Sequence, residues 1–323
     1  MVAALGLACA PPVEEPPLTF TAVTFNTGTS EGMGHDGPPD DGYTGVHAGY
    51  SDLYYGDGLA WQPAVDATRA FLQQVQPDVV GFQEIFYSED CAAIPAEAQT
   101  DFVCQTWQAG DPTVAQIVVG EGYQVACHPG HPDKCAAVKR SFGRFRGCEA
   151  DFCLEGLAGS QVAGCGRGAR IGRGVIDLVE GDELTLVNVH ASSGMVDEDM
   201  QCRVQQVDQV FVDLGDGAPA ANGERNFVLG DLNTDPGRWA DWDPSARRWT
   251  DFAGRGKRFH FVSPVGNDAP GTYAGLVTID HMLSDVLEGS CWAAGVSEGH
   301  PAVIDALYFD HRPLVCALDT RAP

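Results

Sequence analysis

The sequence predicts an α/β protein in which two β-sheets pack together and helices cover their outer faces. Segments with strand character outnumber those with helical spacing, and the helical segments fall between pairs of strands. Apolar residues make up 44% of the 323 residues, which is enough for a sizeable core. No apolar run approaches the roughly 20 residues that a membrane span needs. The length fits one large domain or two small ones.

The first quarter of the chain contains two predicted strands and one predicted helix. Residues 18–26 alternate between apolar and polar side chains and are β-rich, so they predict the first strand. Residues 27–58 are rich in Gly, Asp and Tyr and show no periodicity, which predicts a loop. Residues 59–75 have helical spacing and end before Pro77, and residues 78–86 predict a short buried strand.

The rest of the chain begins with a Cys-rich segment, residues 88–168, which we expect to be an insertion. Residues 173–180 and 183–190 predict a hairpin that turns at Gly181 and Asp182. Residues 200–214 carry apolar side chains on one helical face. Further strands are predicted at residues 226–231, 277–283 and 314–318.

Cysteine usage favours an exported protein. The chain has 11 Cys, a high number for a cytosolic enzyme. Residues 1–17 resemble the end of a bacterial lipoprotein signal followed by a Pro/Glu-rich tether, with Cys9 as the lipidated residue. Without Cys9 an even number of Cys remains, which predicts five disulfides. We therefore expect a secreted or cell-envelope protein, with residue Cys9 as a membrane anchor and residues 18–323 as one domain.

The charge balance restricts the partners. There are 19 Lys and Arg against 45 Asp and Glu, so the net charge is −26. An acidic protein gains nothing from counterion release on a polyanion, which argues against tight nonspecific DNA binding. A local basic groove could still bind a phosphate group.

Six short segments place polar or charged residues next to apolar strands. Carboxylates and imidazoles in such places are costly to bury unless they pair or bind metal, and oxygen-rich sites suit Mg²⁺. The segments are Thr24-Phe25-Asn26, Gln83-Glu84, Asn188-Val189-His190, Gly230-Asp231-Leu232-Asn233, Ile279-Asp280-His281 and Asp310-His311-Arg312-Pro313.

This ordered set resembles the motifs of the endonuclease/exonuclease/phosphatase superfamily, which includes pancreatic deoxyribonuclease, neutral sphingomyelinases and inositol polyphosphate phosphatases. The resemblance implies a deoxyribonuclease-like two-sheet sandwich and Mg²⁺-dependent phosphoester hydrolysis. Mn²⁺ would be a substitute for Mg²⁺, and a role for Ca²⁺ is left open.

The resemblance and the chemistry of the side chains together assign the metal and substrate contacts. Glu84 is the principal metal carboxylate, and Asp310 is a further metal ligand. Asn26 is uncharged, so it can contact metal or phosphate without repelling the anion. Arg173 opens a strand where relatives often place a cation, and it is a candidate phosphate contact.

Five residues are the candidate catalytic set. Asp231 would orient or deprotonate the attacking water, and Asn233 would hold the phosphate. Asp280 and His311 would form an acid–base dyad, in which the carboxylate fixes the imidazole and stabilises its charged form. His190 would be a second imidazole near the leaving group.

The sequence therefore predicts an exported, Mg²⁺-dependent phosphoesterase that hydrolyses phosphodiester bonds by attack of water, in a chain that we expect to be a monomer. The substrate would be a nucleic acid or a phospholipid headgroup. The alternatives are a sphingomyelinase-like enzyme, an inositol-type phosphatase and a non-catalytic binding module on the same fold. Two segments that mix Arg with aromatic residues, 139–146 and 247–258, would grip a nucleotide or headgroup, or they are solvated loops.

Overall fold

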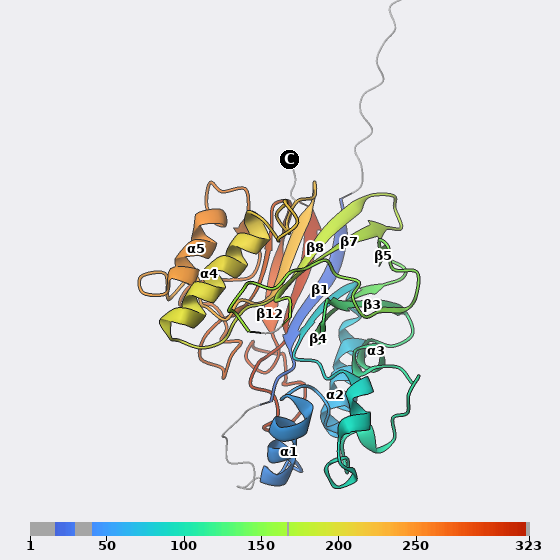
Figure 1. The fold of residues 1–323 in the computed structure, drawn as a ribbon. Coiled ribbons are helices and arrows are strands. Elements are labelled where there is room, and N and C mark those ends of the chain that lie inside the picture. The colour runs from blue at the N-terminus through green and yellow to red at the C-terminus, as the bar shows by residue number, and fades with distance from the viewer. Residues whose placement is uncertain (1–16, 30–40, 167, 321–323) are drawn as a thin grey trace, which may run out of the picture.

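The computed structural model describes residues 17–29, 41–166 and 168–320, which form two packed β-sheets with helices on their outer faces (Figure 1). One sheet has seven strands in the order β12-β13-β1-β2-β4-β3-β6, and the other has six in the order β10-β11-β9-β8-β7-β5. This arrangement confirms the predicted two-sheet α/β fold. Cys9 and nearly all of the predicted N-terminal tail lie outside the described residues.

The strands of the seven-stranded sheet come from both ends of the chain and from the Cys-rich segment. They are β1 (Thr19–Asn26), β2 (Val79–Gln83), β3 (Tyr123–His128), β4 (His131–Lys139), β6 (Phe152–Cys153), β12 (Leu287–Ala293) and β13 (Leu314–Thr320). In the middle of this sheet β1 runs parallel to β2 and antiparallel to β13.

The six-stranded sheet consists of β5 (Gly143–Phe145), β7 (Ile171–Leu178), β8 (Glu183–His190), β9 (Asn226–Asp231), β10 (His260–Phe261) and β11 (Asp280–Ser284). In this sheet β8 runs parallel to β9, while β7–β8 and β9–β11 are antiparallel. Each sheet therefore has one central parallel pair, and these two pairs end at the same side of the molecule.

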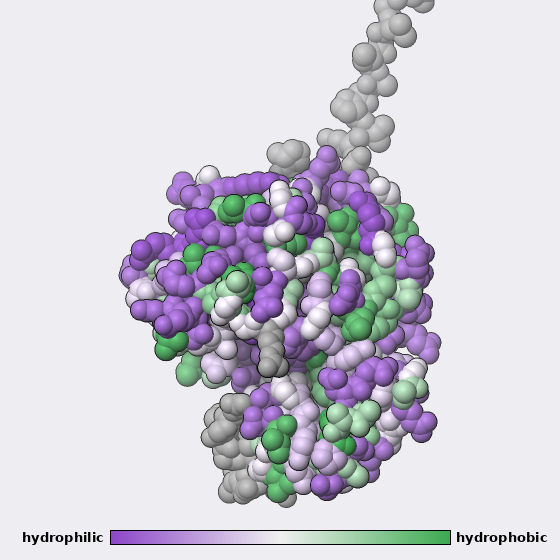
Figure 2. Space-filling view, viewed as in Figure 1, coloured by the Kyte–Doolittle hydropathy of each residue, from purple (hydrophilic) through white to green (hydrophobic). Residues whose placement is uncertain are grey.

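Helices cover the outer face of each sheet. The α-helices are α1 (Gly45–Tyr55), α2 (Gln62–Val75), α3 (Val114–Val119), α4 (Asp197–Phe211) and α5 (Pro244–Phe252), and the 3₁₀ segments are η1 (Ser88–Ala93), η2 (Ala96–Ala98) and η3 (Val103–Gln105). On the seven-stranded sheet α2 packs against β1 and β2, and α4 and α5 lie side by side over the six-stranded sheet (Figure 1). Hydrophilic residues dominate the surface over α4 and α5 (Figure 2).

Side-chain alternation along the strands creates the core between the sheets. Phe20 and Ala22 of β1 point inward and pack against Leu186 of β8 and Leu229 of β9. The intervening residues of β1 point outward toward α2. The same alternation carries polar residues into the inter-sheet space at the ends of the strands.

Most predicted elements exist, with shifted boundaries. The first strand, the strand at residues 226–231 and the hairpin agree with β1, β9 and the β7–β8 pair. The first predicted helix begins later, at Gln62, and the second spans Asp197–Phe211. These differences are of the size expected when fraying and capping decide a boundary.

The predicted loop over residues 27–58 is wrong for the segment that forms α1. Thr44 caps this helix through a reciprocal pair of hydrogen bonds with His47, and Gly56 ends it in a left-handed conformation. A capping box normally has Glu or Gln at the third helical position, so His47 concealed the start signal.

The Cys-rich segment, which we expect to be an insertion, is built into both sheets. It supplies β3, β4 and β6 to the seven-stranded sheet and β5 to the six-stranded sheet. Five disulfides form, as predicted: Cys91–Cys104, Cys127–Cys135, Cys148–Cys153, Cys165–Cys202 and Cys291–Cys316. Such a set is typical of exported proteins. Within the described residues no helix is long and apolar enough to cross a membrane.

Candidate active site

The candidate residues meet where the inner faces of both sheets end. His190, Asp231 and Asp280 are register partners on the three neighbouring strands β8, β9 and β11. Asn26 ends β1 on the facing sheet, on the same inward face as Phe20 and Ala22. Because inward positions recur every second residue, the apolar core continues directly into this polar cluster.

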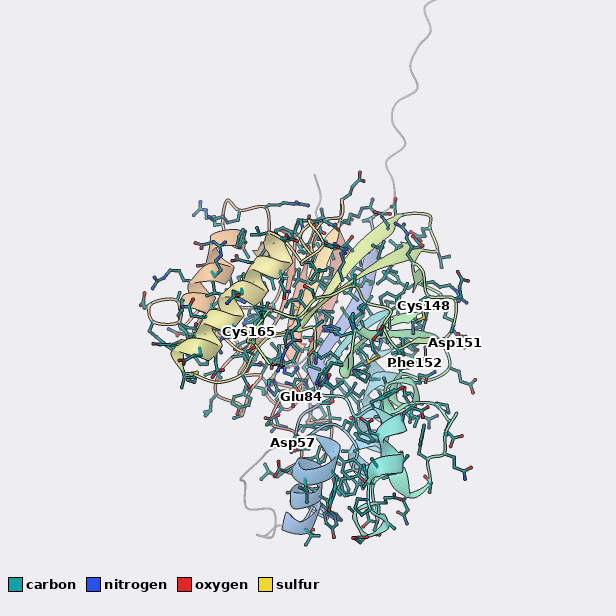
Figure 3. The ribbon with its side chains drawn as sticks, viewed as in Figure 1. Asp57, Glu84, Cys148, Asp151, Phe152 and Cys165 are labelled. Carbon is teal, nitrogen blue, oxygen red and sulfur yellow. A yellow bond between two sulfur atoms is a disulfide. The ribbon has the colours of Figure 1, made fainter. Side chains whose placement is uncertain are left out.

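Glu84 joins the cluster through a left-handed backbone conformation. Strict alternation after Gln83 would direct its side chain away from the inter-sheet space, but φ of Glu84 is +56°. Its backbone is held on both sides: Ile85 N donates to Asp133 O at 2.9 Å, and Glu84 O accepts from Thr27 Oγ1 at 3.0 Å. Figure 3 shows Glu84 at the end of the sandwich nearest α1. Such strain in a well-supported backbone is typical of functional sites.

Asn26 connects the two carboxylates of the cluster. Its Nδ2 donates to Glu84 Oε1 at 3.3 Å and to Asp231 Oδ2 at 3.1 Å, and its Oδ1 accepts from Gly28 N at 3.0 Å. His190 Nε2 lies 3.2 Å from Glu84 Oε1 and 3.9 Å from Asp231 Oδ2. The structure therefore brings Asn26, Glu84, Asp231 and His190 into direct contact.

The predicted dyad is also formed. His311 Nδ1 lies 2.8 Å from Asp280 Oδ2, and both side chains are buried. The other ring nitrogen of His311, Nε2, lies 3.8 Å from Asp231 Oδ2. Tyr273 covers the imidazole, with ring centroids 5.0 Å apart. The carboxylate thus fixes the ring so that Nε2 faces the cluster.

Asn233 lies beside Asp231 because the chain turns sharply after β9. Its φ is +50°, and its N–H donates to Asp231 Oδ1 at 2.7 Å. Its Nδ2 donates to Asp231 Oδ2 and to Ala191 O, both at 2.9 Å. These contacts have the form of an Asx turn, and they orient the Asp231 carboxylate toward the cluster.

Asp310 approaches from the loop before β13. Its N–H donates to Gly28 O at 3.4 Å, and Gly28 is packed against the Glu84 carboxylate so closely that a Cβ there would clash with Oε2. Asp310 Oδ1 is buried without a hydrogen-bond partner. A buried, unpartnered carboxylate oxygen is costly, which indicates a missing cationic or donor partner.

Burial and neighbouring charges shift the pKa values of the site residues in opposite directions. Burial raises the pKa of Asp231 to about 6, although His311 counteracts it, and burial raises the pKa of Asp310 to about 7. Burial would lower the pKa of His311, but Asp280 and Asp231 outweigh it and raise that pKa to about 10. Burial also acts on Glu84, yet hydrogen bonding and the charge of His190 leave its pKa below the usual value.

The donor set fits a hard divalent cation. Glu84 and Asp310 supply carboxylate oxygens and Asn26 an amide oxygen. Burial raises the pKa of Asp231 and of Asp310, and a bound cation would offset this cost of burying carboxylate charge. Asp231, Asp280 and His311 also lie close enough together to share an ion. The hydrogen bond between His311 Nδ1 and Asp280 already engages these two residues with each other.

Arg173 does not reach the cluster, so its predicted phosphate contact is corrected. It lies on β7 at an outward position, two residues from Ile171, which packs under α4. Its guanidinium donates to Asp216 Oδ2 at 2.5 Å and to Pro219 O at 3.2 Å. The hairpin register could have revealed this, because Arg173 pairs with Val187, whereas Asn188 and His190 have the opposite parity.

The Arg-rich segments are likewise engaged elsewhere. Arg146 forms ion pairs with Asp177 and Glu183, and Arg248 on α5 pairs with Asp208 and Asp251. The expectation of solvated loops is also incomplete, because residues 244–252 form a helix with one buried face.

Sequence reasoning missed the buried support of the site. Gln83 Nε2 donates to Asn188 Oδ1 at 2.7 Å, and Asn188 Nδ2 donates to Phe82 O and Cys135 O, so these amides link the two sheets beneath Glu84 and His190. Lys134 is fully buried at 2.7 Å from Asp133 Oδ1. The strand character of residues 131–139 was the available signal for Lys134.

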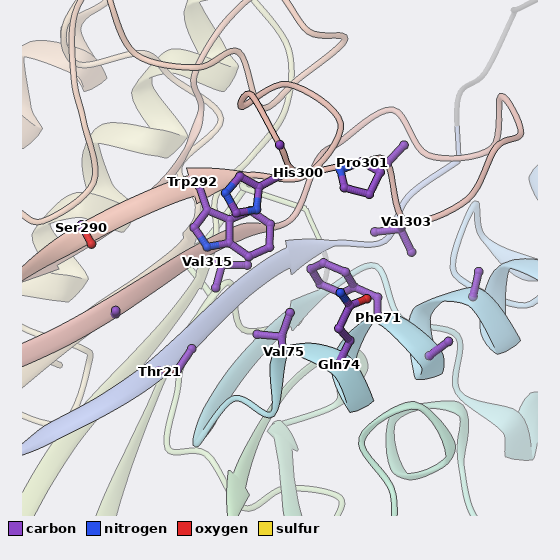
Figure 4. A pocket seen from close by; sticks show the side chains of 15 residues that line it. Thr21, Phe71, Gln74, Val75, Ser290, Trp292, His300, Pro301, Val303 and Val315 are labelled. Atoms are coloured by element: carbon purple, nitrogen blue, oxygen red, sulfur yellow. The ribbon is translucent and has the colours of Figure 1, made fainter.

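A separate apolar pocket of about 660 Å³ lies on the outer face of the seven-stranded sheet (Figure 4). Phe71 of α2 borders it, and Trp292 and His300 stack with ring centroids 3.8 Å apart. No carboxylate lines this pocket among the described residues. Its volume would accommodate a small molecule, but the acid–base chemistry is found in the inter-sheet cluster.

Comparison with solved structures identifies the fold. An endonuclease/exonuclease/phosphatase from Beutenbergia cavernae is 14% identical, with a TM-score of 0.53 over 94% of this chain and 72% of that chain. The 3′ phosphatase NExo from Neisseria, bound to a product DNA hairpin, is 12% identical, with a TM-score of 0.50 over 92% of this chain and 98% of that chain. The catalytic domain of Xenopus laevis APE2 is 14% identical, with a TM-score of 0.50 over 94% and 93% of the two chains.

No family model and no curated protein matches the sequence. The structural likeness spans nearly the whole chain and agrees with the fold that the six motifs imply. The chain therefore has the fold of the endonuclease/exonuclease/phosphatase superfamily.

Proposed function

We propose that the protein is a metal-dependent phosphoric ester hydrolase that cleaves phosphodiester bonds by attack of water. The observation that carries this proposal is the convergence of Glu84, His190, Asp231 and the Asp280–His311 dyad around Asn26. The same residues come from the strands of both sheets and from the loops next to them, so the arrangement depends on the whole fold. The printed names of two structural neighbours, an endonuclease/exonuclease/phosphatase and a 3′ phosphatase, agree with this chemistry.

Asp231 is the residue that activates water. It is buried, its pKa is raised to about 6 by burial, and Asn233 holds both of its oxygens. A base whose pKa lies near the working pH transfers protons efficiently. Asp231 therefore orients a water molecule for in-line attack and accepts its proton.

The two imidazoles and two amides bind the phosphate. The His311 imidazolium, held by Asp280, presents Nε2 to a phosphoryl oxygen as negative charge develops. His190 lies on the Glu84 side of the cluster and serves the leaving group. Asn26 and Asn233 each donate to Asp231 Oδ2, and each would exchange that hydrogen bond for one to a phosphate oxygen without adding negative charge.

Mg²⁺ is the cation that the proposal assigns to Glu84, Asp310 and Asn26, with Mn²⁺ as a substitute. When bound, such an ion neutralises phosphate charge and acts as a Lewis acid. The protein's own contribution is to hold these oxygens in a site where Asp310 Oδ1 otherwise lacks a partner.

The test is hydrolysis of bis-(p-nitrophenyl) phosphate by the oxidised protein, with Mg²⁺ and then with excess EDTA. Metal-dependent release of p-nitrophenol supports the phosphodiesterase. Turnover of p-nitrophenyl phosphate alone would replace it with a phosphomonoesterase, and absence of both in folded protein would favour a binding module. DNA and sphingomyelin would then be compared as natural substrates at equal salt, because the net charge of −26 opposes polyanion binding.

We further propose that the protein is exported, acts as a monomer and is attached to the cell envelope through Cys9. The five disulfides support export. Fractionation of the native host followed by mass spectrometry of the N-terminal peptide tests the anchor, since lipidated Cys9 would appear as a modified N-terminal residue. An unmodified, uncleaved N-terminus on an intracellular protein would overturn export and anchoring together.

A further inference from the structure

A buried ion pair lies beneath the two loops that leave the site on the six-stranded sheet. Arg203 of α4 and Asp243, which caps α5, are 3.2 Å apart, and both side chains are 0% exposed. A buried guanidinium is costly unless nearly all of its N–H groups are bonded. Arg203 meets that requirement with three further hydrogen bonds, to Ser192, Gly194 and Ser245. Neither member of the pair belongs to the catalytic cluster.

Arg203 binds the loop that follows His190. Its Nη1 donates to Ser192 O at 3.0 Å and to Gly194 O at 2.7 Å. One turn later on α4, Gln206 makes two 2.8 Å hydrogen bonds to Ser192, accepting from its N–H and donating to its Oγ. Together, Arg203 and Gln206 therefore fix residues 192–194 to α4.

Asp243 binds the loop that follows Asp231. Its Oδ2 accepts from Thr234 Oγ1 at 2.5 Å as well as from Arg203, and its Oδ1 accepts from the N–H and hydroxyl of Ser245. Arg203 Nε also donates to Ser245 Oγ at 3.0 Å. The ion pair thus connects both loops to one another through α4 and α5.

Asn233 lies between the two tethered points. Its Nδ2 donates to Ala191 O, one residue before Ser192, and its successor is Thr234, which Asp243 holds. With φ at +50°, the backbone of Asn233 lies in the left-handed region, which Asn adopts more readily than other non-glycine residues. The two loops that Arg203 and Asp243 join hold Asn233 from both sides.

We propose that Arg203 and Asp243 are positioning residues that set the orientation of Asn233, and through it Asp231, for phosphate binding. This inference rests on the function proposed above. A displacement of about 1 Å at a positioning contact can cost about 100-fold in rate. The pair thereby acts on substrate binding and turnover without touching substrate or metal.

The test compares the double variant Arg203→Met/Asp243→Asn with wild type. Removing both charges avoids an unpaired buried ion. The amide oxygen introduced by Asp243→Asn would keep the cap of α5, so the variant is expected to fold. We expect kcat/KM for bis-(p-nitrophenyl) phosphate to fall about 10- to 100-fold, with a higher KM as well as a lower kcat. Mg²⁺ affinity by calorimetry should stay unchanged, because Glu84 and Asp310 lie outside the tethered loops.

Arg248→Met is the matched control. Arg248 also joins α5 to α4, through Asp208 at 2.7 Å, but it is one-third exposed and contacts neither loop. We expect its kcat and KM to equal those of wild type. Arg203→Lys should recover part of the loss, because Lys keeps the charge toward Asp243 but lacks the planar fork that reaches two carbonyls and Ser245.

A readout independent of turnover separates this inference from the proposed function. The side-chain amide resonance of Asn233, assigned with Asn233→Ala, should shift or broaden in the double variant and remain in place in Arg248→Met. If the Asn233 resonance shifts in this way but the wild type has no activity, the phosphoesterase function is refuted while Arg203 and Asp243 still position Asn233. An unchanged Asn233 resonance in the double variant would overturn the positioning role. The same holds if kcat falls at constant KM in the double variant and falls equally in Arg248→Met.

Discussion

The inter-sheet cluster and the apolar pocket lie on opposite faces of the same seven-stranded sheet, and they differ in chemistry. The pocket is roomy and lined by Phe71, Trp292 and other apolar side chains. The cluster contains Glu84, Asp231 and Asp310 within a buried network, and one oxygen of Asp310 is unpartnered. Burial of opposed and unsatisfied charge favours the cluster over the apolar pocket as the candidate catalytic site.

Among substitutions in the cluster and the pocket, we expect the largest loss of kcat at Asp231. Asp231→Asn keeps the shape and the hydrogen bond to Asn26 but removes the base. We expect kcat to fall by about 10²–10⁴-fold, measured on bis-(p-nitrophenyl) phosphate with saturating Mg²⁺. The thermal unfolding midpoint should not fall, since a buried acidic charge has been removed. Activity within a few-fold of wild type would transfer the role of base to another residue.

The Asp280–His311 dyad should make the stability of the protein depend on pH. In protein freed of metal with EDTA, the pKa of His311 is raised from 6.5 to about 10 by Asp280 and Asp231, against the effect of burial. A raised pKa in the folded state stabilises the fold fully below pH 6.5, and that stability is lost as the pH rises through about 10.

Urea unfolding at pH 6, 8 and 10 measures this loss. The free energy of unfolding of wild type should decline relative to that of His311→Gln by more than about 1 kcal/mol, the equivalent of one pKa unit. Parallel pH profiles for the two proteins would mean that folding does not raise the pKa of His311.

On the pocket side we expect a stability effect without a catalytic one. Trp292 stacks on His300 and contacts Phe71, and it is only partly buried. Trp292→Ala should lower the free energy of unfolding by about 1–3 kcal/mol and leave kcat/KM within twofold. A tenfold loss of turnover in folded protein would show that the two faces of the sheet are coupled.

The smallest effect is expected at Arg173. Its guanidinium pairs with Asp216, which is 45% exposed, on the helix-covered side of β7. Arg173→Met should change kcat/KM less than twofold and stability by less than about 1 kcal/mol. A selective rise in KM would restore Arg173 as a phosphate contact and require the loop around Asp216 to rearrange.

The sequence predicted the parts of the site that strand alternation and strand ends specify. Asn26, His190 and Asp231 each end a strand, and Asp280 begins one. The apolar pattern of these strands sets the inward face, so the meeting of the four residues follows from the two-sheet fold. Glu84 also reaches the cluster, but by a left-handed turn that no periodicity announces.

The parts that the sequence did not predict depend on long-range contacts. In the sequence, Arg203 is a polar residue on an amphipathic helix. Its partner Asp243 lies 40 residues further along the chain, so the ion pair cannot be predicted from local sequence. Strands β3 and β4 were not predicted. Cys127 and Cys135 indicated disulfides, but they did not reveal that the residues around them pair as strands. Tertiary pairing, rather than local propensity, decides such elements.

We propose that the inter-sheet cluster is a metal-dependent phosphoesterase site, and this proposal depends most heavily on Glu84. Glu84→Gln preserves side-chain volume and the contact with Asn26 while removing the principal metal carboxylate. The measurement is phosphodiester turnover across a Mg²⁺ titration, with His300→Ala in the apolar pocket as the matched control. We expect turnover to be lost in Glu84→Gln and to persist in His300→Ala. Equal, Mg²⁺-dependent turnover in wild type and Glu84→Gln would show that the cluster is not the metal-dependent site.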